Sequence, residues 1–124
     1  MIKKALYASE ARSKILSGVK QIASAVKVTL GPLGRNVLIS KAEVIDYGLK
    51  NWPITVTKDG FRTTHEFDVE DSFEKVGVLM VQEAALKSVI QSGDGTSSTV
   101  VLLEAIVEGG MKLIEDGCNP VQLK

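Results

Sequence analysis

The sequence predicts a mainly α-helical fold with several helices and one small β-hairpin. Apolar residues recur at three- and four-residue spacing over three long stretches, which is typical of amphipathic helices. Two short runs rich in β-branched residues lie between the first and second of these stretches. The chain has 124 residues, of which 44% are apolar and 24% charged. Both values are close to the globular average, so we expect one compact domain or part of a larger one.

The first predicted helix covers about Ala8 to Val28. Its apolar stripe consists of Ala8, Ala11, Ile15, Val19, Ile22, Ala23 and Val26. Gly31 and Pro32 follow closely, and they end the helix because glycine accepts a left-handed exit and proline blocks continuation.

The predicted hairpin pairs Asn36–Ser40 with Ile54–Thr57. The connection 41–53 is long for a hairpin loop. It is also unusually apolar, since it contains Val44, Ile45, Tyr47, Leu49 and Trp52. We expect these side chains to pack against another part of the protein or against another chain.

Asp59-Gly60 is a predicted turn, and Asp59 is expected to cap a short helix. A second long helix then runs to about Gln91, and acidic residues favour its positive end; these are Asp68, Glu70 and Asp71. One row of this helix consists of Phe73, Val76, Met80, Ala84 and Ser88, with Gly77, Val81 and Ala85 beside it.

The third predicted long helix covers about Ser97 to Glu115, and Asp116-Gly117 ends it. Its apolar register consists of Val100, Leu103, Val107, Met111 and Ile114. Asn119-Pro120 is typical of a further helix start. Only four residues follow Pro120, and one turn of helix is not a stable terminus. We therefore expect the chain to be the N-terminal part of a longer protein, or to depend on partners.

Composition excludes several classes of function. Fifteen Lys and Arg residues balance 15 Asp and Glu residues, so no basic excess favours nucleic acid as a partner. No apolar stretch is long enough to cross a membrane, and the N-terminus lacks a secretory signal. The single Cys118 points to a reducing compartment, hence a cytoplasmic location. His65 and Cys118 cannot make a zinc site, and no third group is identifiable that would orient them as a nucleophilic pair.

The segment richest in possible chemistry is Gly93–Thr99, which reads GDGTSST ahead of a helix. Its glycines let the backbone approach a ligand, and the free amides and hydroxyls at a helix start favour an anion. Asp94 would repel a phosphate unless a divalent cation lies between them, so the pattern favours a Mg²⁺–phosphate site. An ordinary helix–helix joint, with a glycine C-cap and a Thr or Ser N-cap, explains the same residues.

Two further corners have similar alternatives. At Thr29–Gly34, exposed helix carbonyls can coordinate a cation and Gly31 lets a phosphate approach, although a helix stop explains the same residues. In Thr57–Gly60, Lys58 is a point charge and Asp59 is a candidate metal ligand or general base. An ordinary turn explains that segment equally well.

Taken together and in order, these corners closely resemble the N-terminal part of a group I chaperonin, the bacterial and organellar ATP-driven folding ring. The matching segments are Thr29–Val37, Thr57–Gly60, Gly93–Thr96 and Gly109-Gly110 to Asn119-Pro120. The resemblance runs from about Ala8 to Lys124, apart from the insertion at 41–53. It implies that residues 1–124 form the N-terminal segment of an equatorial domain, the mainly helical part that binds ATP and makes ring contacts.

The resemblance also implies roles for individual residues. Asp59 matches a catalytic carboxylate near the γ-phosphate, and Asp94 matches the Mg²⁺ ligand. Three residues match positions that hold K⁺: Thr29, Lys58 and Ser97. The expected nucleotide-binding residues are Thr29, Leu30, Gly31, Pro32, Lys58, Gly93, Asp94, Gly95, Thr96, Ser97 and Ser98. The implied partners are identical ring subunits, non-native client proteins and a lid co-chaperonin.

The sequence departs from the family pattern at several points. Leu33 stands where the family usually has lysine, and Ser97 and Ser98 replace threonines, which keeps the hydroxyls but loses rotamer-fixing methyls. The loop 41–53 is longer than the usual stem-loop, so altered contacts between subunits are expected. The intermediate and apical domains, the second catalytic Asp and the C-terminal equatorial half are absent from these residues, so we do not expect this chain alone to be active.

Three functions therefore stay open at this stage. The first is the ATP-binding part of a chaperonin that encloses and releases non-native proteins, including a virus-encoded relative working in a host cytoplasm. The second is a chaperonin-derived assembly module or fragment without turnover, which Leu33 and the enlarged loop favour. The third is an unrelated helical nucleotide-binding module.

Overall fold

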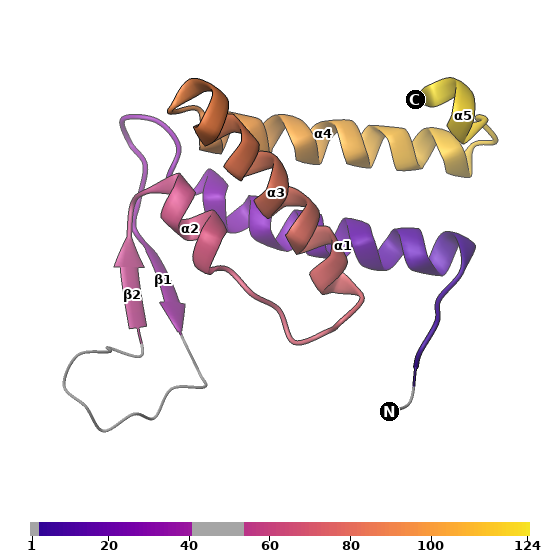
Figure 1. The fold of residues 1–124 in the computed structure, drawn as a ribbon, viewed down its shortest axis with the longest axis horizontal. Helices are drawn as coiled ribbons and strands as arrows, with labels where there is room; N and C mark the ends of the chain where they lie inside the picture. The colour runs from indigo at the N-terminus through magenta and orange to yellow at the C-terminus, as the bar shows by residue number, and fades with distance from the viewer. Residues whose placement is uncertain (1–2, 41–53) are drawn as a thin grey trace.

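The computed structural model describes residues 3–40 and 54–124 of the chain. These residues form five helices and a two-stranded antiparallel sheet (Figure 1). In chain order the elements are α1 (Ala8–Lys27), β1 (Val37–Ser40), β2 (Ile54–Thr57), α2 (Gly60–Glu66), α3 (Glu74–Ser92), α4 (Thr96–Glu115) and α5 (Pro120–Leu123). The predicted mainly helical fold with a small hairpin is confirmed. The predictions for the loop 41–53 lie outside the described residues.

The hairpin has a simple register that separates a buried face from an exposed one. Val37 pairs with Thr57 and Ser40 pairs with Ile54. Ile39 and Thr55, which lie opposite each other, are both buried. The alternation follows from the period of two in a β-strand, and it directs Thr57 inward at the point where the chain enters α2.

The closest helix contact is the crossing of α1 and α3, where two glycines remove the side chains that would hold the backbones apart. A Cβ on Gly18 would collide with the Glu74 carbonyl, and a Cβ on Gly77 would collide with the Ile15 carbonyl oxygen. Any larger residue at either position would therefore force two backbones apart. The crossing sets the closest approach of the two helices.

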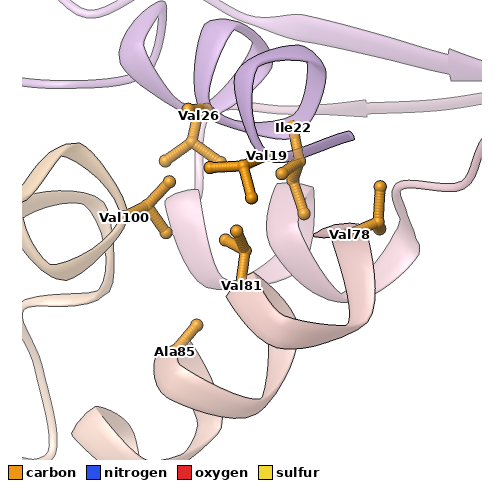
Figure 2. Packing of buried hydrophobic residues seen from close by; sticks show 8 residues of the cluster. Val19, Ile22, Val26, Val78, Val81, Ala85 and Val100 are labelled. Carbon is orange, nitrogen blue, oxygen red and sulfur yellow. The ribbon is translucent and has the colours of Figure 1, made fainter. Parts of the chain in front are cut away.

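The core lies between α1, α3 and α4 and is almost entirely aliphatic. Figure 2 shows valine and isoleucine side chains from the three helices meeting in one cluster, together with Ala85. The buried members of the cluster are Val19, Ile22, Ala23, Val26, Val78, Val81, Ala85 and Val100. Five of these residues are fully buried valines. Valine has few rotamers, which suits a closely packed core.

The buried face of α3 is the row beside the longer apolar row seen in the sequence. Gly77, Val81 and Ala85 are buried, as is Val78, whereas Met80 keeps 43% of its surface exposed. The glycine at the crossing decides this orientation, because only that face of α3 can approach α1 closely. Sequence periodicity alone does not distinguish two adjacent apolar rows.

Ion pairs join α1 to α4 beside the core. Lys20 Nζ lies 2.6 Å from Glu108 Oε1, and Lys27 forms an ion pair with Glu104. Glu104 is buried, so its pairing with Lys27 offsets the desolvation of the carboxylate. Both pairs bind the C-terminal half of α1 to α4, close to the point where α1 ends.

One glutamine of α3 forms hydrogen bonds to the end of the short helix α2. Gln82 Nε2 donates to the carbonyl oxygens of Thr64 and Phe67, each at 3.0 Å. These carbonyls lie at the C-terminal end of α2, where helix carbonyls lack partners within the helix. Gln82 therefore fixes α2 against α3, and with it the position of the α2 N-terminus.

The start of α3 is held by Asp71, as the acidic residues in the sequence predicted. Asp71 Oδ1 accepts hydrogen bonds from the amides of Phe73 and Glu74 at 2.8 and 3.1 Å. Its Oδ2 accepts one from Lys14 Nζ of α1 at 2.9 Å. The Lys14 hydrogen bond is the largest of the effects that lower the pKa of Asp71 to about 2, and the two amides lower it further.

We predict that this carboxylate makes folding stability depend on pH in the acid range. A lowered pKa in the folded state stabilises the protein above the unfolded pKa of about 3.9, and that contribution is lost as pH falls through about 2. Asp71→Asn should therefore be less stable than the wild type at neutral pH, with the difference shrinking in acid. Urea unfolding followed by circular dichroism at several pH values measures it.

Glu70→Gln is the matched control for this experiment, because Glu70 is exposed and forms no ion pair or hydrogen bond with another described residue. Its effect on the urea midpoint should not vary with pH in the same way. An Asp71→Asn deficit that stays constant from neutral pH down to about pH 2 would contradict the assignment.

Candidate functional site

The three corners identified in the sequence lie at one end of the helical layer. Figure 1 shows the C-terminal ends of α1 and α3 and the start of α4 at the same end of the molecule, next to the hairpin and α2. The core and the ion pairs of α1 fix these ends relative to one another.

The first corner follows α1 and is closed by backbone hydrogen bonds. Thr29 is buried, and its Oγ1 donates to the Val26 carbonyl at 2.7 Å. Gly31 has a φ of 78°, in the left-handed region that glycine tolerates. A Cβ on Gly34 would collide with the Thr29 carbonyl oxygen, so the chain folds back directly over the helix end.

The second corner joins β2 to α2, and it holds Asp59 from several directions. The Asp59 amide donates to Thr57 Oγ1 at 3.1 Å, and its carbonyl accepts from the Thr63 hydroxyl at 2.8 Å. Asp59 Oδ1 accepts from the Phe61 amide at 3.0 Å, so Asp59 is the N-cap of α2. The predicted cap is confirmed. The other carboxylate oxygen, Oδ2, accepts no hydrogen bond from another described residue.

The third corner joins α3 to α4 through two left-handed glycines. Gly93 has a φ of 74° and is the C-cap of α3, as in the ordinary helix–helix joint that the sequence left open. Gly95 has a φ of 87° and is the N-cap of α4. No side chain caps α4, so the ordinary joint with a Thr or Ser N-cap is not what the structure contains. The first amides of a 20-residue helix consequently lack a capping acceptor.

The three corners converge on one cavity of about 560 Å³. That volume lies within the range of about 300 to 1,000 Å³ that is usual for small-molecule and cofactor sites. Its lining residues are Thr29, Leu30, Lys58, Asp59, Gly60, Phe61, Val89, Gly93, Asp94, Gly95, Thr96, Ser97 and Ser98.

Gly60 is the point of closest approach between the corners. A Cβ at Gly60 would collide with Ser97 Oγ and would lie 3.5 Å from Thr29 Oγ1. One residue of the second corner therefore lies against hydroxyl groups of both others. Only glycine fits at this position. Because it has no side chain, the hydroxyls of Ser97 and Thr29 can lie next to it.

The charges of the cavity wall are not neutralised by the rest of the described chain. Lys58, Asp59 and Asp94 are all exposed, and none forms an ion pair with another described residue. Asp94 Oδ1 accepts from the Gly95 amide at 2.7 Å, which holds one carboxylate oxygen, whereas Oδ2 accepts no hydrogen bond from another described residue. The cavity thus combines two carboxylates, one ammonium group, several hydroxyls and the open amides of α4.

Most of the predicted site residues line this cavity, but two do not. Gly31 and Pro32 follow Leu30 in the chain and are exposed, yet they are not part of the cavity wall. Their assignment as nucleotide-binding residues stays a prediction. The same holds for the individual roles expected of the lining residues, because proximity in a cavity does not identify a ligand.

Three lining residues were not predicted as site residues: Gly60, Phe61 and Val89. Gly60 stands inside the motif Thr57–Gly60, and Phe61 follows it in the first turn of α2. Val89 precedes Gly93 by four residues, so it lies on the same face of α3 as the glycine. Counting one helical turn back from Gly93 would have identified Val89.

Residues 22–124 match the model of the TCP-1/cpn60 chaperonin family. Because the match covers most of the chain, the protein belongs to this family. No helix in the ranges 3–40 and 54–124 has the length and apolar character needed to span a bilayer. The same ranges contain no group of three or more His, Cys, Asp or Glu side chains arranged to hold a metal ion.

The convergence of the corners predicts an energetic coupling between Gly60 and Ser97. Gly60→Ala should destabilise the protein by about 1 to 3 kcal/mol, because the added methyl group displaces the Ser97 hydroxyl. Ser97→Ala removes that hydroxyl, so the double variant should recover much of the loss. A urea-unfolding cycle over the four proteins should give a coupling of at least about 0.5 kcal/mol. Strictly additive effects would show that these corners are not in contact.

Proposed function

We propose that this chain is the N-terminal segment of the equatorial domain of a group I chaperonin, and that its cavity binds Mg-ATP. The observation that supports the proposal best is the convergence of three separate corners on one polar cavity. The proposal extends to ATP-driven folding of client proteins by a ring of identical subunits, to a lid co-chaperonin, and to a cytoplasmic location. The ring, the clients and the lid are properties of the group I family, and the location rests on the single Cys118.

The residues of the cavity fit a nucleoside triphosphate with its cation. The open amides of α4, together with the hydroxyls of Thr96, Ser97 and Ser98, are suitable donors to phosphate oxygens. Mg²⁺ is usually bound by one or two carboxylates together with substrate phosphates rather than by a protein cage. A site with Asp94 on its wall and no larger acidic cluster in the described chain suits that arrangement.

When bound, the cation would neutralise charge at the phosphates, and the protein would position the phosphates, the cations and the attacking water. In this proposal Asp94 would hold Mg²⁺, and oxygen atoms of Thr29, Lys58 and Ser97 would hold K⁺; at Lys58 this can only be the backbone carbonyl, because the ammonium group has no acceptor. Asp59 is fixed by its own cap bond, which leaves Oδ2 to orient the attacking water. Phosphoryl transfer depends mainly on positioning and electrostatic stabilisation, so a site without a nucleophilic His or Cys is sufficient.

Asp94→Ala should abolish the contribution of Mg²⁺ to nucleotide binding. We expect ADP affinity measured by calorimetry in MgCl₂ to fall at least about tenfold, since a metal ligand is removed. Affinity in EDTA should change little. Asp116→Ala is the control, because Asp116 is also exposed but lies outside the cavity, at the far end of α4. Unchanged ADP affinity in MgCl₂ would remove this assignment of the site.

Asp59→Asn should slow ATP hydrolysis in the full-length protein at least about tenfold while ATP affinity stays within about twofold. Asparagine caps helices as well as aspartate does, so this variant keeps the α2 cap and removes only the charge. Asp59→Ala removes both, at a further cost of about 1 kcal/mol in stability. Phosphate release measured with Mg²⁺ and K⁺ is the readout. An unaltered turnover number in Asp59→Asn would contradict the catalytic role.

A second candidate function is an assembly module that forms ring contacts without turnover. Large apolar side chains are exposed on the hairpin and on α4: Leu38, Val56, Leu102 and Ile106. Leu38 and Val56 lie opposite each other in the strand register, which makes one continuous apolar surface. A large particle by light scattering that releases no phosphate from ATP would favour this function over the first.

A further inference from the structure

Two hydroxyl side chains contact the loop Gly93–Gly95 without lining the cavity. Ser88 lies in α3 and Thr99 lies in α4, and both are half-buried. Neither belongs to the cavity wall, although the loop between them does. Ser88 occupies the last position of an apolar row of α3. A half-buried hydroxyl in such a row needs a hydrogen-bond partner.

The partners form a chain from one helix through the other to the loop. Thr99 Oγ1 donates to Ser88 Oγ at 3.0 Å, and Ser88 Oγ donates to the carbonyl oxygen of Asp94 at 3.3 Å. Each hydroxyl has a single proton. When Thr99 directs its proton to Ser88, the proton of Ser88 is left to donate to the Asp94 carbonyl.

Thr99 also holds the neighbouring residue of the loop. Its Oγ1 lies 2.9 Å from the Gly95 carbonyl oxygen, which also accepts the Thr99 amide at 2.9 Å. Because Thr99 has one hydroxyl proton, it donates either to Ser88 or to the Gly95 carbonyl at any moment, and in both cases the proton of Ser88 remains for the Asp94 carbonyl. On the same peptide, the Gly95 amide donates to Asp94 Oδ1 at 2.7 Å. Because the amide of this peptide holds Oδ1, restraint of the peptide also restrains the carboxylate.

The loop requires such restraint because of its composition. Gly93 and Gly95 both adopt left-handed φ angles, and glycine has the largest conformational freedom of any residue. A carboxylate between two glycines would otherwise sample many directions. Groups that orient a metal ligand without touching the metal commonly change metal affinity by about 10- to 100-fold when they are removed.

We propose that Ser88 and Thr99 are positioning residues that hold the Asp94 peptide so that its carboxylate is already directed for a divalent cation. This inference rests on the proposed function, which assigns the cation to Asp94. It assigns to two residues outside the cavity a specific part in cation affinity. We expect Ser88 and Thr99 not to affect nucleotide contacts that form without the cation.

The test compares ADP binding in MgCl₂ and in EDTA for the whole chain. Ser88→Ala and Thr99→Val should each lower ADP affinity in MgCl₂ by about tenfold and leave affinity in EDTA within about twofold. Thr99→Ser keeps the hydroxyl and should retain wild-type affinity. Because the two side chains act in one chain of hydrogen bonds, the double variant should lose little more than either single variant.

Ser92→Ala is the matched control, since Ser92 adjoins the same loop, is exposed and donates no side-chain hydrogen bond to another described residue. It should behave as the wild type. A readout without nucleotide is amide hydrogen exchange at Gly95, which should be faster in Ser88→Ala and Thr99→Val than in Ser92→Ala. Global unfolding is measured alongside the exchange. An increase at Gly95 larger than the loss of global stability accounts for then reports on the loop.

Two results would overturn this inference and leave the proposed function standing. One is a loss no larger in Ser88→Ala and Thr99→Val than in Ser92→Ala. The other is an equal loss in EDTA, which would mean that the whole cavity is deformed. If the wild-type chain itself shows no Mg²⁺-dependent ADP binding, the proposed function fails and this inference fails with it.

Discussion

The close crossing of α1 and α3 is the constraint on which the rest of the structure depends. Gly18 and Gly77 leave no room for a side chain between the two backbones, so the helices meet at one point and in one orientation. That orientation places Val78 and Val81 in one core cluster with Val19 and brings the C-terminal ends of α1 and α3 to the same end of the molecule. The core therefore sets where the corners lie relative to one another, and local hydrogen bonds hold the backbone of each corner.

Each corner satisfies its own backbone and still leaves chemistry facing the cavity. Thr29 and Asp59 each use a side-chain oxygen for a local hydrogen bond, to Val26 and from Phe61 respectively. The start of α4 is different, because glycine caps it and its amides stay open. Local rigidity is thus combined with open donors and acceptors at one place. This is the condition for electrostatic catalysis by a preorganised site.

Periodicity predicted the helices well: α1 and α4 begin and end within one residue of the predicted bounds. It could not decide which row of α3 is buried, because that depends on the glycine contact with α1. The glycine motifs identified the corners, but their convergence is a property of the tertiary packing. Ser88 shows the same limit. In the sequence it is one member of a mostly apolar row, and only the fold places it beside Asp94.

Backbone amide NMR during a titration with Mg-ADP tests the single-cavity account most directly. The account predicts that residues 29–30, 58–61 and 93–98 shift together and saturate at the same ligand concentration, because they line one cavity. Amides of the far half of α4 should stay unchanged. Shifts confined to one corner, or corners that saturate at clearly different concentrations, would contradict it.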